Sequence, residues 1–134
     1  MPVILLILLL ALSGVPAFAV DAPTGPTLSD LMKIPTQRAA WFGMLAGEKL
    51  PPWIEDFAAT LDGPPTPSIP IKSGYQVYTL AFTCKPNECG DNQLFVLFSP
   101  GGAKAWGLLV IGTEKKWLGD PDDSVKQAIL SGLQ

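Results

Sequence analysis

The two cysteines of this 134-residue chain lie five positions apart, and their type and spacing point more clearly to a chemical role than those of any other residues. In an oxidising compartment we expect Cys84 and Cys89 to form a disulfide bond. Closing so small a ring stabilises a fold by only about 2 kcal/mol, so stability alone is a weak reason for it. A closed ring also holds its side chains in one shape, which lowers the cost of ordering them on a partner.

We therefore predict a binding loop at this position. The enclosed residues are Lys85, Pro86, Asn87 and Glu88. Pro86 stiffens the ring by fixing its own φ, and Gly90 lets the chain turn into the next segment. The alternative is a hairpin that the disulfide bond stabilises and that binds no partner.

The composition argues against an enzyme and against several kinds of ligand. The chain has no histidine, which removes Ser-His-Asp and Cys-His catalysis. Two cysteines fall short of the four ligands of a structural zinc site, so we expect neither a metal nor a cofactor. The nine Lys and Arg residues form no basic run and the net charge is −3, so no nucleic acid is expected. A hydrolase built on Glu55 and Asp56 is a weak alternative, because adjacent side chains point apart.

The N-terminus has the pattern of a secretory signal peptide. Residues 3–12 are almost entirely Leu, Ile and Val, and a small-x-small site, Ala17-Phe18-Ala19, follows. The apolar run is too short for a permanent membrane anchor, and a buried N-terminal helix is the alternative. We predict a signal peptide at residues 1–19 and a single exported domain at 20–134, which fits the length of one domain.

Helical patterns come first in the predicted domain. Thr27 or Ser29 suits the start of a short helix that runs to residue 33, and Pro35 suits the first turn of a second. Gly47 is placed to end that second helix. Its apolar residues recur at mostly helical spacing and are expected to face a sheet: Ala39, Ala40, Phe42, Met44 and Leu45. Trp41 lies beside this stripe, and core packing is favoured over a ligand contact.

The rest of the chain favours strands. Residues 50–54 contain two prolines and cannot continue the second helix, and Trp53 is expected to dock on the domain. Residues 63–70 are expected to be a loop that leads at most into an edge strand. Strands are predicted at 75–84, 93–99 and 105–111, with an antiparallel turn at 99–102. A terminal helix follows, with Val125, Ala128, Ile129 and Leu133 on one face. The fold class is α+β, an antiparallel sheet flanked by helices, from which the closed loop protrudes between two strands.

The loop sequence Cys84-Lys85-Pro86-Asn87-Glu88-Cys89-Gly90 resembles the Cys-Lys-Pro-His-Asp-Cys-Gly loop of the Ivy family, the bacterial inhibitors of vertebrate, C-type lysozyme. Lys49-Leu50-Pro51-Pro52-Trp53 is similar to that family's Lys-Leu-Pro-x-Trp segment, and Tyr75-Gln76-Val77 resembles the approach to its loop. The resemblance covers residues 27–133. It implies an antiparallel sheet flanked by helices and a periplasmic location.

The resemblance also implies a function, the inhibition of muramidases by a loop that plugs the active-site cleft. In the family, the loop histidine contacts the catalytic carboxylates of lysozyme. Asn87 occupies that position here, and it donates through an amide that carries no charge. C-type lysozyme and bacterial lytic transglycosylases, which use a single catalytic acid, are therefore both candidate partners. The alternative function is a periplasmic interaction module that keeps the scaffold without inhibiting lysozyme.

Overall fold

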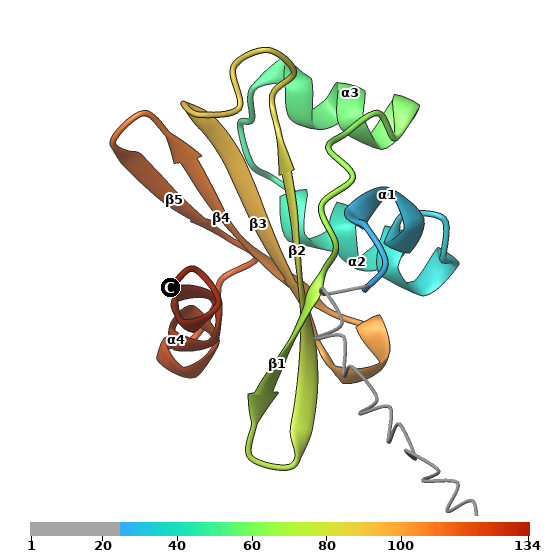
Figure 1. Cartoon of the computed structure of the whole chain (residues 1–134), viewed down its shortest axis with the longest axis vertical. Coiled ribbons are helices and arrows are strands. Elements are labelled where there is room, and N and C mark those ends of the chain that lie inside the picture. The colour runs from blue at the N-terminus through green and yellow to red at the C-terminus, as the bar shows by residue number, and fades with distance from the viewer. Residues whose placement is uncertain (1–24) are drawn as a thin grey trace, which may run out of the picture.

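The computed structural model describes residues 25–134, so the predicted signal peptide lies outside the described residues. Three helices precede five strands, and a fourth helix closes the chain (Figure 1). The helices are α1 (Leu28–Leu31), α2 (Pro35–Leu45), α3 (Pro52–Thr60) and α4 (Asp123–Ser131). The strands are β1 (Ile69–Ser73), β2 (Gln76–Cys84), β3 (Asn92–Phe98), β4 (Ala105–Ile111) and β5 (Glu114–Leu118). Among residues 25–134, no helix combines the length and apolar character needed to cross a membrane.

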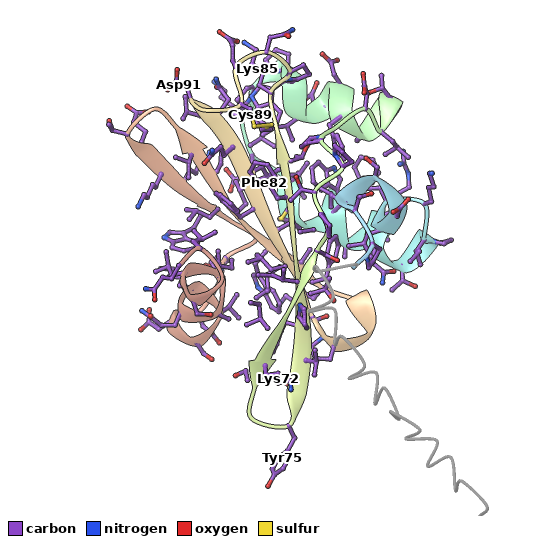
Figure 2. The ribbon with its side chains drawn as sticks, viewed as in Figure 1. Lys72, Tyr75, Phe82, Lys85, Cys89 and Asp91 are labelled. Carbon is purple, nitrogen blue, oxygen red and sulfur yellow. A yellow bond between two sulfur atoms is a disulfide. The ribbon has the colours of Figure 1, made fainter. Side chains whose placement is uncertain are left out.

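The five strands form one antiparallel sheet in the order of the sequence, β1-β2-β3-β4-β5. In such a meander alternate connections lie at the same end of the sheet. The β2–β3 loop with both cysteines and the β4–β5 turn therefore share one end, and the β1–β2 turn with Tyr75 lies at the other (Figures 1 and 2). The α+β class and the antiparallel pairing at residues 99–102 are confirmed.

Side chains alternate between two faces of the sheet, and each face has its own core. Ala81 pairs with Val96 on the face covered by α1, α2 and α3. Leu80 pairs with Leu97 on the opposite face, where Val125 and Ile129 of α4 pack. The sheet is thus sandwiched between two helical layers (Figure 1), and this leaves the loops at its ends free to project.

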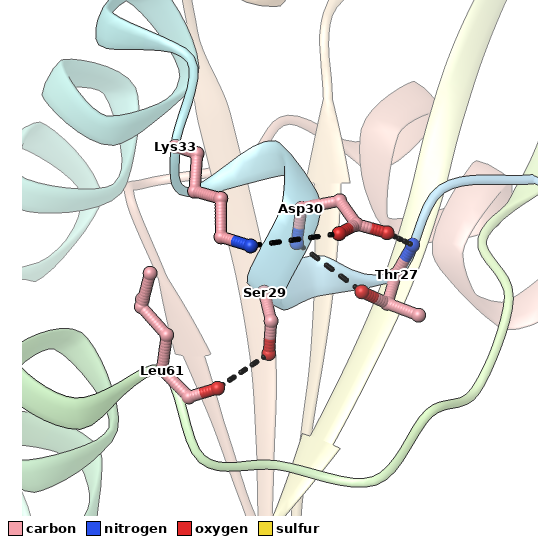
Figure 3. A network of polar contacts seen from close by, with 5 residues as sticks. All are labelled: Thr27, Ser29, Asp30, Lys33 and Leu61. Carbon is pink, nitrogen blue, oxygen red and sulfur yellow. Dashed lines mark hydrogen bonds and ion pairs between the residues drawn. The ribbon is translucent and has the colours of Figure 1, made fainter.

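Short capping interactions fix the N-terminal helices. Thr27, rather than Ser29, caps α1: its hydroxyl accepts from the Asp30 N–H at 3.2 Å, and the Asp30 carboxylate accepts from the Thr27 N–H at 3.1 Å (Figure 3). Such a reciprocal box satisfies two backbone donors that a helix start leaves unpaired. The Ser29 hydroxyl donates to the Leu61 carbonyl at 2.9 Å, which connects α1 to the end of α3 (Figure 3).

Parts of the predicted helical faces are wrong. In α2 the buried residues are Ala40, Trp41 and Met44, whereas Phe42 is 49% exposed under the guanidinium of Arg38. Trp41 is fully buried and lies 5.5 Å from the Phe57 ring, so the core interpretation of Trp41 is confirmed. The shift arises because α2 faces both the sheet and α3, so its buried stripe is rotated towards Trp41.

Three further differences concern elements outside α2. Residues 52–60 form α3, which begins directly after Pro51 because proline is well suited to the first turn of a helix. Residues 114–118 form β5, an edge strand that the sequence analysis did not predict. In α4, Val125 and Ile129 are buried as predicted, but Leu133 follows the end of the helix and is 40% exposed.

Candidate functional site

The Cys84–Cys89 loop lies at the end of the sheet, between β2 and β3 (Figure 2). Cys84 is the last residue of β2 and is buried, and its disulfide bond to Cys89 brings the two Cα atoms to 4.9 Å. The predicted bond is thereby confirmed. Beyond this buried base, Pro86, Asn87 and Glu88 are exposed at the tip. The structure therefore brings all six predicted site residues together in one projecting ring.

The tip of the ring is a tight turn from Lys85 to Glu88. The Glu88 N–H donates to the Lys85 carbonyl at 3.1 Å, with Pro86 and Asn87 at the two central positions. Asn87 has a φ of +65°. Proline followed by a residue with positive φ is the signature of a type II turn, in which asparagine is one of the few side chains tolerated at the second position. The residue type at the tip is therefore selected by the backbone as well as by any partner.

The remaining backbone of the loop is bonded within itself. The N–H groups of Asp91 and Asn92 both donate to the Glu88 carbonyl, at 3.2 and 3.1 Å, and the Lys85 N–H donates to the Asn92 carbonyl at 3.0 Å. Two consecutive turns thus lead back into β3. A loop with this many internal hydrogen bonds is ordered before it meets a partner, which lowers the entropy lost on binding.

The charges at the tip are paired with each other. Lys85 forms an ion pair with Glu88, and their side chains are 41% and 54% exposed. From the sequence, Lys85 could either supply a positive charge to a partner or simply point into solvent. In the structure its ammonium group is paired with the Glu88 carboxylate at the other end of the turn. The tip therefore presents a neutral amide next to an exposed ion pair.

Both flanks of the loop contact other parts of the molecule. On one side, the Gly112 N–H in the β4–β5 turn donates to the Asp91 carbonyl at 2.8 Å. On the other side, residues of α3 and of the loop line one small hollow of about 100 Å³. Its lining residues are Trp53, Asp56, Phe57, Thr60, Asp62, Cys84 and Pro86.

The expected docking of Trp53 is confirmed, since its side chain is 7% exposed, but helix α3 itself was not predicted. The i, i+1, i+4, i+5 spacing of Trp53, Ile54, Phe57 and Ala58 is the signal that indicates this amphipathic helix.

The carboxylates considered for hydrolysis do not form a site. Glu55 and Asp56 are exposed neighbours on α3. Glu55 lines a groove between α2 and α3, whereas Asp56 lines the hollow beside the loop, so the two point apart as predicted. Among residues 25–134, no three His, Cys, Asp or Glu side chains are grouped to hold a metal ion.

Comparison with known proteins points to one family. The family model described as "Inhibitor of vertebrate lysozyme (Ivy)" matches residues 36–128, which is more than half of the chain. An inhibitor of vertebrate lysozyme from Pseudomonas aeruginosa is 31% identical over 129 aligned residues, covering 85% of this chain and 82% of the relative. An uncharacterised Yersinia pestis protein is 30% identical, covering 89% and 85%. The Escherichia coli K12 inhibitor of vertebrate lysozyme is 33% identical, covering 66% and 54%.

Proposed function

Because this chain belongs to the Ivy family of lysozyme inhibitors, which are not enzymes, we propose that it inhibits muramidases by inserting the Cys84–Cys89 loop into their active-site cleft. Family membership carries the coarser statement, that the chain is an inhibitor with lysozyme as its partner. The plugging mechanism is our proposal, and it rests on the pre-shaped loop at the end of the sheet.

The observation that supports plugging most strongly is the internal bonding of the loop. A disulfide at its base, a type II turn at its tip and three further backbone hydrogen bonds hold three exposed side chains in one arrangement. A glycosidase cleft is concave and is built to enclose a sugar chain between carboxyl groups. A narrow, rigid, polar projection fits such a cleft with little conformational entropy left to lose.

The chemistry of the tip suits an acidic cleft. The Asn87 amide can donate hydrogen bonds to a carboxyl group, and the same turn carries the Lys85 ammonium, which is paired with Glu88. A charged donor forms a hydrogen bond roughly twice as strong as a neutral one, so a tip with asparagine interacts less strongly with a pair of carboxylates than a tip with a protonated histidine. A single catalytic acid, as in a lytic transglycosylase, needs only one donor. We therefore propose that lytic transglycosylases are targets alongside C-type lysozyme.

The proposed setting is the periplasm, where the two cysteines would be oxidised and peptidoglycan is accessible. This part rests on the apolar run and small-x-small site of residues 1–19. Mass spectrometry of the exported protein tests it directly. The expected product begins at residue 20 and is two hydrogens lighter than the reduced chain, whereas an uncut product would contradict export through a cleaved signal peptide.

The test of the proposed function is an inhibition assay with residues 20–134. Inhibition constants are measured against a C-type lysozyme and a lytic transglycosylase for the wild type and for Asn87→His. We expect the wild type to inhibit at least one enzyme, and Asn87→His to gain against lysozyme. Tyr75→His is the matched control, since Tyr75 is fully exposed at the opposite end of the molecule (Figure 2). If neither the wild type nor Asn87→His inhibits any muramidase, the proposal fails.

A further inference from the structure

The segment from Lys49 to Trp53 leads into α3, the helix beside the loop. Pro51 is the N-cap of α3 and Pro52 its first residue, so two fixed φ angles set where the helix begins. Trp53 follows at once and is only 7% exposed, although the first turn of a helix is usually accessible. The two prolines therefore hold a large aromatic side chain in a defined, buried position.

Trp53 faces the base of the loop. It lines the hollow of about 100 Å³ together with Phe57 from the same helix and with Cys84 and Pro86 from the loop. Trp53 and Phe57 are the aromatic rings that α3 contributes to this hollow, beside Asp56 and Thr60. The Trp53 indole N–H is buried without a hydrogen-bond acceptor among the described residues. No polar contact among the described residues holds it; it belongs to the core on this face of the sheet and borders the hollow beside the loop.

The floor beneath the loop is also closely packed. A Cβ added to Gly63 would lie 2.9 Å from Cε2 of Phe57 and 3.0 Å from Oγ1 of Thr83. Gly63 is therefore wedged between α3 and the strand residue that directly precedes Cys84. The far end of α3 is held in turn by the hydrogen bond from Ser29 to Leu61 (Figure 3). Movement of α3 would therefore be transmitted to the end of β2.

We propose that Trp53 is a positioning residue for the inhibitory loop. The disulfide bond fixes the shape of the ring, whereas Trp53 fixes the direction in which the ring leaves the sheet, by supporting Cys84 and Pro86 from the α3 side. The hydrogen bond from Gly112 to Asp91 restrains the opposite flank. This inference rests on the proposed function, because only a plug that must enter a cleft needs a fixed direction.

The test compares two tryptophans that are buried to a similar degree, 7% and 9% exposed. Trp53→Phe shortens the side chain beside the loop. Trp106→Phe makes the same change at a residue 9% exposed on the opposite face of the sheet, in the core covered by α4. For each variant we measure the inhibition constant against the muramidase that the wild type inhibits, the melting temperature, and hydrogen exchange of the Glu88 amide, which is bonded within the tip.

We expect Trp53→Phe to raise the inhibition constant about tenfold and to speed hydrogen exchange of the Glu88 amide relative to the amides of β3. The loop of the free variant would be less ordered, so it would lose more conformational entropy when it binds. Trp106→Phe should change neither quantity. Unchanged values in Trp53→Phe would overturn the inference, and so would an equal rise in both variants, which would indicate general destabilisation. If Trp53→Phe does not fold, Trp53→Tyr is measured in its place, with the same outcomes.

The outcome for the proposed function stays separate. If the wild type inhibits no muramidase, the proposed function fails, yet amide exchange at Glu88 still decides whether Trp53 orders the loop. If the wild type inhibits and Trp53→Phe inhibits equally well with normal exchange, the proposed function stands and the positioning role of Trp53 is wrong.

Discussion

Lys85 and Glu88 form an ion pair across the turn at the tip of the Cys84–Cys89 loop. The loop thus contains its own counter-charge, three residues from the cation. An acidic cleft would compete with Glu88 for the Lys85 ammonium, and it would also repel the Glu88 carboxylate. The pair therefore sets how much positive charge the tip offers to a target.

Replacing Glu88 and replacing Lys85 should shift the inhibition constant in opposite directions. Glu88→Gln leaves the Lys85 ammonium unpaired and removes a repulsive charge, so the inhibition constant against lysozyme should fall about threefold to tenfold. Lys85→Met should raise it. Both side chains are partly exposed, so the free energy of unfolding should change by less than about 1 kcal/mol. Inhibition assays at low and physiological salt, beside urea denaturation, provide the check. Weaker inhibition by Glu88→Gln would contradict this role.

The positive φ of Asn87 separates its backbone role from its side-chain role. Asn87→Gly keeps the turn and removes the amide, so stability should be nearly unchanged while inhibition weakens. Asn87→Val places a β-branched side chain in the left-handed region and should destabilise the protein by about 1 to 2 kcal/mol. Urea denaturation and inhibition assays distinguish the two effects. Equal stability of the glycine and valine variants would show that the turn does not require this conformation.

Gly63 should not tolerate a methyl group. Gly63→Ala pushes against the Phe57 ring and the Thr83 hydroxyl, and overpacking of this kind is expected to destabilise the fold by about 1 to 3 kcal/mol. Gly43→Ala is the matched control, because a Cβ at this exposed helical position meets nothing within 4 Å. That control should be stabilising by about 0.5 to 1 kcal/mol. Thermal or urea denaturation measures both, and a neutral Gly63→Ala would contradict the close packing of α3 against β2.

Asp30 links stability to pH. The hydrogen bonds from the Thr27 backbone and hydroxyl hold the pKa of the Asp30 carboxyl below its usual 3.8, and Lys33 adds a smaller effect (Figure 3). A carboxyl whose pKa is lower in the folded state stabilises the fold above the unfolded-state value, and this contribution is lost as pH falls through the folded-state value. Wild type should therefore be more stable than Asp30→Asn at neutral pH.

The stability difference between wild type and Asp30→Asn should shrink as the pH falls below 3.8. Denaturation curves recorded for both proteins across this range provide the measurement. A difference that stays constant with pH would show that the Thr27–Asp30 box contributes nothing through the charge of the carboxylate. Lysozyme inhibition at neutral pH should be equal in the two proteins, since α1 lies outside the loop.

Much of this fold could be predicted because its signals are local. The alternation in β2 and the Pro-Gly-Gly turn after Ser99 specify a meander, and Cys84 and Cys89 mark the loop that projects from it. The features that were not predicted depend on the tertiary structure around each residue. Pro51 and Pro52 follow a helix that has already ended at Leu45, and they are well suited to the first turn of the next helix, which was not predicted.

The details of the site depend on contacts that no local pattern records. β5 was not predicted because three of its five residues are charged, as is usual for an exposed edge strand. Its hydrogen-bonded pairing with β4, which no local pattern shows, stabilises it as a strand. The Lys85–Glu88 pair requires the type II turn that brings residues 85 and 88 together, and the support from Trp53 requires the tertiary placement of α3.

The central claim is that a pre-shaped ring, and not merely its sequence, inhibits the target. The most direct test compares the inhibition constant of the oxidised protein with that of a Cys84→Ser, Cys89→Ser double variant. Loss of the small ring should lower the free energy of unfolding by only about 2 kcal/mol. Urea denaturation measures this loss, and circular dichroism checks that the variant keeps its fold. We predict that the variant inhibits at least about tenfold more weakly, because its loop must be ordered on binding. Equal inhibition by a folded, cysteine-free protein would contradict the account.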